Sequence, residues 1–178
     1  MVLPAFRASP FCRADHTLFI HLVPMSLDPI QQLVERQAIT DVIFAYCRNV
    51  DLVNASAVAD CFTEDCTVDY GPGMGAVTHG RENIRERLGA GLHRFAATSH
   101  HVSNIEVVFE SAESARTITY LYAWHRFSGD QPDAHLWAQY HDRMSKVQGR
   151  WLIADRVLKV AGQESFDIPW YPIGRQEK

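Results

Sequence analysis

The stretch Ala115–Phe127 reads ARTITYLYAWHRF, and its pattern decides the fold class. β-Branched and aromatic residues dominate it, as is typical of a β-strand, in which neighbouring side chains point to opposite faces. One face carries both arginines. The other has no formal charge and is mainly apolar in its later half: Thr117, Thr119, Leu121, Ala123, His125 and Phe127. The pattern predicts a strand with one face turned inward, so that His125 projects into an enclosed interior.

Three more stretches have the same character: Thr98–Phe109, His135–Val147 and Arg150–Val160. Short turn-forming links such as Gln148-Gly149 separate consecutive stretches. Strands joined by such short links are antiparallel neighbours. The second half of the chain is therefore predicted to form an antiparallel meander.

The first half of the chain is predicted to be mainly helical. Asp28 is a good N-cap, Pro29 suits a first helical turn, and apolar residues then recur at spacings of three and four as far as Val50. The expected elements are helices at residues 29–50, 55–62 and 81–92, and a strand at 66–70 with a hairpin partner at 76–79. Helices followed by a meander indicate an α+β domain, in which the helices cover one face of a strongly curved antiparallel sheet.

The composition is that of a globular protein and excludes several classes. The chain has 178 residues, of which 47% are hydrophobic and 21% charged, with a formal charge of −4. No basic footprint for nucleic acid exists, and no apolar run approaches the ~20 residues that span a bilayer. Four cysteines are too few for a disulfide scaffold. We expect a cytoplasmic protein with neither a nucleic-acid nor a membrane partner.

One domain is expected, flanked by two shorter segments. Residues 1–24 are predicted to be a poorly ordered extension, because they combine early prolines with an interrupted apolar run. Residues 25–162 are predicted to form the domain. Residues 163–178 carry Phe166, Trp170 and Tyr171, so this tail is predicted to dock on the domain.

A few side chains are candidates for chemistry. Asp51 follows the first helix, where a carboxylate opposes the helix dipole and needs solvent or a cationic partner such as histidine. His100 and His101 are neighbours in a strand, so they cannot both enter one pocket. No metal-ligand spacing is present, and no metal is expected. The alternatives are a solvated turn residue for Asp51, a hydrogen-bonded core histidine for His125 and a core aromatic for Tyr46.

Four segments carry a resemblance to a known family: ITDVIFAYCRNVD at residues 39–51, CFTEDCTVDY at 61–70, SHHVSN at 99–104 and GRWLIADR at 149–156. Through them, residues 27–162 resemble the SnoaL-like family of the nuclear-transport-factor-2-like superfamily. The resemblance implies a cone-shaped, strongly curved antiparallel sheet wrapped around N-terminal helices, with an internal apolar pocket. Unrelated activities share this scaffold, so the reaction has to be argued from the site.

Within the superfamily, the sequence resembles the scytalone dehydratases and the bile-acid 7α-dehydratases, which use an Asp–His dyad without a metal or organic cofactor. The resemblance implies that Asp51 is the dyad carboxylate and His100 the base. The spacing of Tyr46 and Asp51 is similar to that of the bile-acid enzymes. Tyr70 and His125 are similar to the second tyrosine and second histidine of the scytalone enzymes.

Three further residues are predicted to contact the substrate: Asn104, Trp124 and Trp137. Strand alternation places Asn104 on the same face as His100, where it would orient the substrate or pack as a polar ladder residue. The two tryptophans would line the cavity or pack beneath the helices.

These observations predict a cofactor-independent dehydratase-type lyase that acts on a compact hydrophobic substrate, such as a polycyclic, steroid-like or aromatic polyketide molecule. One alternative is a ketosteroid-isomerase-like enzyme, which would return the proton to another carbon without loss of water. Another is a non-catalytic ligand-binding or subunit domain, whose function would survive replacement of His100. By analogy with the family, we expect a homodimer or homotrimer assembled through the outer face of the sheet.

Overall fold

The computed structural model describes residues 28–174. The extension predicted for residues 1–24 and the last four residues of the predicted tail lie outside the described residues. Three helices, α1 (Pro29–Asp51), α2 (Ala55–Ala59) and α3 (Arg81–Leu92), accompany one sheet. Its strands are β1 (Phe62–Asp69), β2 (Thr78–His79), β3 (Phe95–Phe109), β4 (Ser114–Phe127), β5 (Ala134–Val147) and β6 (Arg150–Glu164), with a 3₁₀ turn η1 (Pro72–Met74) after β1. The predicted α+β class is confirmed.

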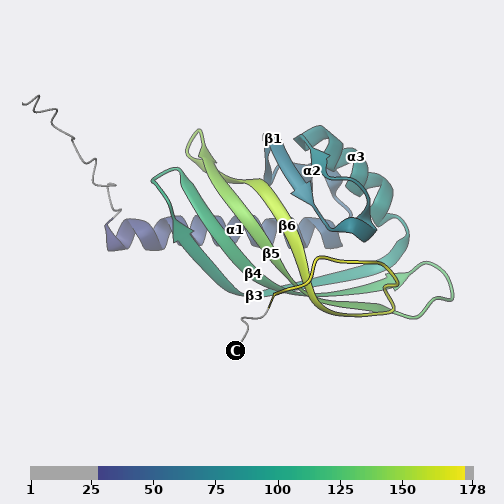
Figure 1. Ribbon diagram of the computed structural model, residues 1–178. Helices are drawn as coiled ribbons and strands as arrows, with labels where there is room; N and C mark the ends of the chain where they lie inside the picture. The colour runs from purple at the N-terminus through teal and green to yellow at the C-terminus, as the bar shows by residue number, and fades with distance from the viewer. Residues whose placement is uncertain (1–27, 175–178) are drawn as a thin grey trace, which may run out of the picture.

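The sheet is mixed, which corrects the prediction of an antiparallel sheet. Its strand order is β2-β1-β6-β5-β4-β3, and β1 pairs with β6 in parallel, whereas the pairs along β3–β6 are antiparallel as predicted. The meander begins with β3 at one edge of the sheet and ends with β6, and β1 pairs with the side of β6 that faces away from β5. Figure 1 shows the long, bent strands with α1 running across them and with α2 and α3 grouped near β1.

Helix α1 begins and packs much as its sequence predicts. The Asp28 side chain accepts hydrogen bonds from the backbone N–H groups of Ile30 and Gln31, and so caps the first turn. Ile39 and Ile43 are fully buried against the sheet. The predicted apolar stripe is wrong in the first turns, where Ile30, Leu33 and Val34 are exposed.

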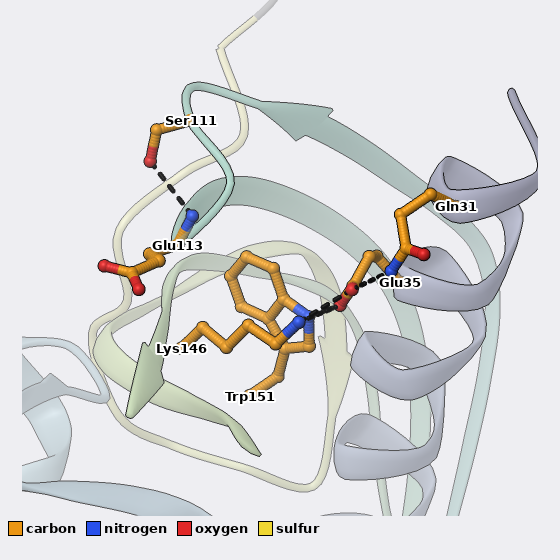
Figure 2. Close-up of polar contacts among 6 residues, drawn as sticks. All are labelled: Gln31, Glu35, Ser111, Glu113, Lys146 and Trp151. Carbon is orange, nitrogen blue, oxygen red and sulfur yellow. Dashed lines mark hydrogen bonds and ion pairs between the residues drawn. The ribbon is translucent and has the colours of Figure 1, made fainter. Parts of the chain in front are cut away.

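A buried carboxylate anchors that same half of α1. Glu35 is 5% exposed. Its oxygens accept hydrogen bonds from Lys146 Nζ at 2.7 and 2.8 Å, from Trp151 Nε1 at 2.6 Å and from the Gln31 side chain (Figure 2). Lys146 and Trp151 flank the β5–β6 turn, so a single side chain of α1 fixes the helix to the end of the sheet. A nearby contact, from the Glu113 N–H to Ser111 Oγ, closes the β3–β4 turn (Figure 2).

A second ion pair lies within the core. Arg156 on β6 is fully buried and donates two hydrogen bonds to Asp142 on β5, at 2.8 and 2.7 Å. Its guanidinium carbon lies 4.1 Å from the ring centroid of Tyr46 and 3.9 Å from that of Tyr140. The rings thus pack on a cation whose charge is already balanced by Asp142. Within residues 28–174, no helix is both long and apolar enough to cross a membrane.

Candidate active site

A cavity of about 490 Å³ lies between the inner face of the sheet, the C-terminal half of α1 and α3. This volume is within the range of small-molecule pockets, roughly 300–1,000 Å³. Most of its wall is aliphatic or aromatic: Val50, Leu88, Leu92, Phe95, Leu121, Leu136, Leu158, Phe166 and Trp170. Polar side chains enter this apolar wall at a few points, and among them are His100, His125, Tyr46 and Tyr70.

Asp51 and His100 are in direct contact. Asp51 is the last residue of α1, and its Oδ1 lies 2.7 Å from His100 Nδ1. Its Oδ2 accepts the backbone N–H of His100 at 2.9 Å, and Thr98 Oγ1 donates to Oδ1 at 2.8 Å. Burial acts to raise the pKa of Asp51, but the hydrogen bonds from His100 and Thr98 outweigh it, so the pKa is lowered. The carboxylate is therefore held charged and faces an N–H at Nδ1, which leaves His100 Nε2 for a substrate.

His125 lies across the β3–β4 ladder from Thr98, on the inner face that the strand pattern predicts. Its ring centroid is 5.3 Å from that of His100, in an edge-to-face arrangement. Burial, followed by the nearby charges of His100 and Arg94, lowers the pKa of His125 to about 3. Its Nδ1 is buried and has no hydrogen-bond partner within the described chain. His125 is therefore a neutral imidazole in the cavity wall with an unused polar atom.

Tyr46 and Tyr70 form a hydrogen-bonded pair in the same wall. Their hydroxyl oxygens are 2.8 Å apart, and both side chains are buried. Burial raises the pKa of each phenol well above the ordinary value for tyrosine. Both groups therefore remain protonated near neutral pH. One hydroxyl donates to the other, so the pair has one O–H left to donate to a ligand.

The C-terminal segment, residues 165–174, contributes another part of the wall. The Phe166 ring centroid lies 5.2 Å from that of His125, and Phe166 also packs against Trp170. The segment is tied to the loop after β1, because the Gly73 N–H donates to the Pro169 carbonyl at 2.8 Å. A Cβ at Gly73 would lie 2.6 Å from that carbonyl oxygen, so only glycine permits this close approach.

The structure places Trp124 and Trp137 away from the cavity, which corrects the prediction that they line it. Both lie on the outer face of the sheet, opposite to His125. Trp124 donates to Asp133, and Trp137 is 45% exposed. The alternation along β4 already separates Trp124 from His125, since successive strand residues point to opposite faces.

Asn104 is also outside the cavity, because β3 contains a bulge. The register with β4 shifts between Ser103 and Glu106, and Asn104 has a positive φ of 47°. Such a bulge inserts a residue and reverses the alternation of faces. Beyond the bulge, the odd-numbered residue Val107 is buried, whereas the even-numbered Asn104 is exposed. The prediction that Asn104 shares a face with His100 is wrong for this reason.

The comparison with known families decides the identity of the fold. The profile of the SnoaL-like domain matches residues 31–157. The chain belongs to the SnoaL-like family. The predicted family is thus confirmed, and the curved mixed sheet described above matches the cone-shaped fold of the family. A search of curated proteins found no match.

Solved structures resemble this SnoaL-like domain over most of its length. A candidate scytalone dehydratase from Novosphingobium aromaticivorans is 34% identical, with a TM-score of 0.76 over 82% of this chain and 97% of the other. A candidate aromatic ring hydroxylase from the same organism is 23% identical, with a TM-score of 0.67 over 73% and 91%. A hexachlorocyclohexane dehydrochlorinase from Novosphingobium barchaimii is 17% identical, with a TM-score of 0.68 over 80% and 97%. The latter two show the fold alone.

Several residues of this SnoaL-like site were not predicted from its sequence. Thr98 had a usable signal, because it lies two residues before His100 and so shares its strand face. Arg87 and Arg94 had none, since they reach the cavity only in three dimensions. The aromatic side chains of the C-terminal segment predicted docking but did not indicate that Phe166 lines the cavity. Among residues 28–174, no three His, Cys, Asp or Glu side chains are grouped so that they could hold a metal ion.

The buried His125 of this SnoaL-like domain predicts a pH-dependent stability. The pKa of His125 falls from 6.5 to about 3 on folding, because burial favours the neutral ring. The contribution of this neutral ring to the free energy of unfolding is complete above pH 6.5 and is lost as the pH falls towards 3. Between pH 8 and pH 5, we expect the wild type to lose about 2 kcal/mol more unfolding free energy than His125→Asn. Urea titrations at the two pH values measure this difference.

His101→Asn is the matched control, because His101 is exposed and neighbours the dyad histidine on the other side of β3. It should retain the pH dependence of the wild type. Equal pH dependence in the wild type and His125→Asn would contradict the neutral, buried state of His125.

Proposed function

We propose that this SnoaL-like domain is a cofactor-independent lyase that removes water from a compact hydrophobic β-hydroxy ketone. The observation that carries the proposal is the 2.7 Å contact between Asp51 and His100 at the wall of an apolar cavity. A carboxylate that orients an imidazole and stabilises its protonated form makes a general base. The aliphatic and aromatic wall favours a ring system over a polar substrate.

The reaction begins with proton removal. His100 Nε2 takes a proton from the carbon next to the carbonyl, and the electron pair of the broken C–H bond forms an enolate. Asp51 stabilises the resulting imidazolium through Nδ1–H. The enolate then expels the β-hydroxyl group, and the imidazolium returns its proton to the leaving oxygen as water. His100 ends in its starting state, so no co-reactant is consumed.

The other polar groups suit the charges that develop in this reaction. Tyr46 and Tyr70 stay protonated, and a phenol aimed at the carbonyl oxygen would stabilise the enolate as an oxyanion-hole donor does. His125 offers a neutral imidazole whose Nδ1 is unpartnered among the described residues, and it can hold the leaving hydroxyl group. In a dry cavity such contacts are stronger than in water.

The comparisons give further support. The 34% identical structure is of a candidate scytalone dehydratase, whose name denotes loss of water from a small molecule. This likeness supports a small-molecule-converting enzyme. The proposed class of substrate rests on the apolar lining of the cavity.

The test uses 3-hydroxy-1-tetralone, a bicyclic β-hydroxy ketone that loses water to give the fluorescent product 1-naphthol. We expect turnover by the wild type and none by His100→Ala. Androst-5-ene-3,17-dione tests the isomerase alternative, because its conversion moves a double bond without loss of water. Isomerisation without dehydration would replace the proposed reaction, and failure to convert either probe would count against a lyase of this substrate class.

We also propose that the protein forms a homodimer through the outer face of the sheet. Tyr120 and Trp137 are 48% and 45% exposed there, and the ring centroid of Tyr122 lies 5.7 Å from that of Trp137. We call these three residues the outer aromatic patch. Large exposed apolar patches on soluble proteins are often interaction sites. A symmetric dimer would cover the patch on both copies.

Trp137→Glu is expected to convert the dimer to a monomer, since it places an unpaired charge in the proposed interface. Light scattering coupled to size-exclusion chromatography measures the mass. Val77→Glu is the matched control, because Val77 is similarly exposed, at 42%, but lies outside the outer aromatic patch. A monomeric wild type, or a Trp137→Glu variant with unchanged mass, would contradict the proposal.

A further inference from the structure

Among the described residues, two arginines reach the cavity, and Arg87 is already engaged. Its guanidinium donates to the Ala76 carbonyl at 2.8 Å and also to the Met74 carbonyl and the Thr78 hydroxyl. Its guanidinium carbon also lies 5.4 Å from the Tyr70 ring centroid. Arg87 therefore holds the loop between β1 and β2, and its donors are largely used within the protein.

Arg94 is not engaged in this way. It lies between the end of α3 and the start of β3, is exposed at the cavity rim, and stacks with its guanidinium carbon 4.7 Å from the Phe95 ring centroid. Phe95 in turn lies 4.7 Å from the His125 ring. Within residues 28–174, no carboxylate is within 4 Å of Arg94 and no hydrogen bond from its side chain is present. Its planar set of donors is thus available at the entrance to the cavity.

The charge around the cavity favours an anion. The described residues that line the cavity include Arg87 and Arg94 but neither an aspartate nor a glutamate. The nearby Asp51 carboxylate is already satisfied by Thr98 and by two groups of His100. The lowered pKa of His125, to which the charge of Arg94 contributes, is consistent with a positive field at the cavity wall.

We propose that Arg94 binds an anionic oxygen group of the substrate, such as a carboxylate, and that the substrate is therefore a fused-ring molecule with an acidic substituent. This inference deepens the proposed function and rests on it. The acidic group pairs with Arg94 at the rim while the ring system enters the apolar interior as far as His100. Guanidinium matches a carboxylate through two parallel hydrogen bonds, and its partial exposure limits the cost of desolvation.

The test compares the binding of 2-naphthoate with that of 2-naphthamide, a neutral molecule of nearly the same shape, by isothermal titration calorimetry. We expect the wild type to bind the anion about tenfold more tightly than the amide, as is typical of one charge-assisted contact. Arg94→Gln should bring the two affinities together. Arg94→Lys should keep part of the preference, because it retains the charge but not the fork of donors.

Arg126→Gln is the control for general charge, since Arg126 is exposed on β4 but outside the cavity lining. It should retain the full preference. Equal affinities in the wild type, no binding of 2-naphthoate, or an unchanged preference in Arg94→Gln would each overturn the proposal. A preference that survives Arg94→Gln but disappears in His100→Ala would assign the anion to the imidazole instead.

This experiment separates the inference from the proposed reaction. It measures binding alone, so an inactive His100→Ala variant is expected to show the same preference as the wild type. If 3-hydroxy-1-tetralone is not dehydrated while the anion preference depends on Arg94, only the reaction is wrong. If dehydration occurs and Arg94 has no effect on binding, only the substrate class is wrong.

Discussion

Asp51→Asn is expected to lower kcat for dehydration of 3-hydroxy-1-tetralone by about 10⁴-fold, the order of loss seen when the aspartate that orients the histidine of a Ser-His-Asp triad is neutralised. The amide would no longer stabilise an imidazolium at His100, and its N–H group can face Nδ1 and favour the wrong tautomer. The loss should appear in kcat and in kcat/KM alike, because the charge interaction strengthens in the transition state.

Thr98→Val is the graded control for this result. It removes one of three hydrogen bonds to the Asp51 carboxylate and leaves the charge in place. We expect a loss of about tenfold, at the low end for one hydrogen bond to a charged group. Circular dichroism and thermal unfolding should show that both variants are folded. An Asp51→Asn enzyme within tenfold of the wild type would exclude the dyad as the catalytic base.

Asp142→Asn is expected to lower the free energy of unfolding by about 3–5 kcal/mol, because it leaves the fully buried guanidinium of Arg156 without its counter-charge. The effect should extend to the site, since Tyr46 and Tyr140 both pack on that guanidinium. Urea unfolding followed by circular dichroism measures the difference.

The same two strands provide a matched control. Asp155 on β6 faces Arg143 on β5 in the adjacent cross-strand pair, on the exposed side of the sheet. Asp155→Asn breaks an ion pair of the same kind in solvent, so we expect a loss of at most about 1 kcal/mol. Similar losses for Asp142→Asn and Asp155→Asn would contradict the argument that burial decides the cost.

Much of this architecture was predictable because its signals are local. The alternation in residues 115–127 places His125 on the inner face, and the start of α1 is determined by its capping residue and proline. The Asp51–His100 contact was expected only through the family resemblance. Neither residue signals in isolation that a helix end and a strand will meet.

The remaining features depend on distant parts of the chain. The parallel pairing of β1 with β6 joins residues about 90 positions apart, for example Phe62 with Ile153, and no turn between them signals it. The bulge in β3 changes which face each side chain takes, and its position is not visible in the alternation that it interrupts. The role of Arg94 depends on what is missing around it, which only the assembled cavity reveals.

The C-terminal segment has a consequence for how such a protein can be re-engineered. Asp51, His100 and His125 belong to regular elements of the scaffold, whereas Phe166 and Trp170 stand on a stretch that follows the last strand. Libraries confined to residues 165–174 can therefore reshape the space above the reacting atoms while the helix and strands that carry the proton-transfer groups keep their positions. Selectivity and chemistry can be varied separately in this scaffold.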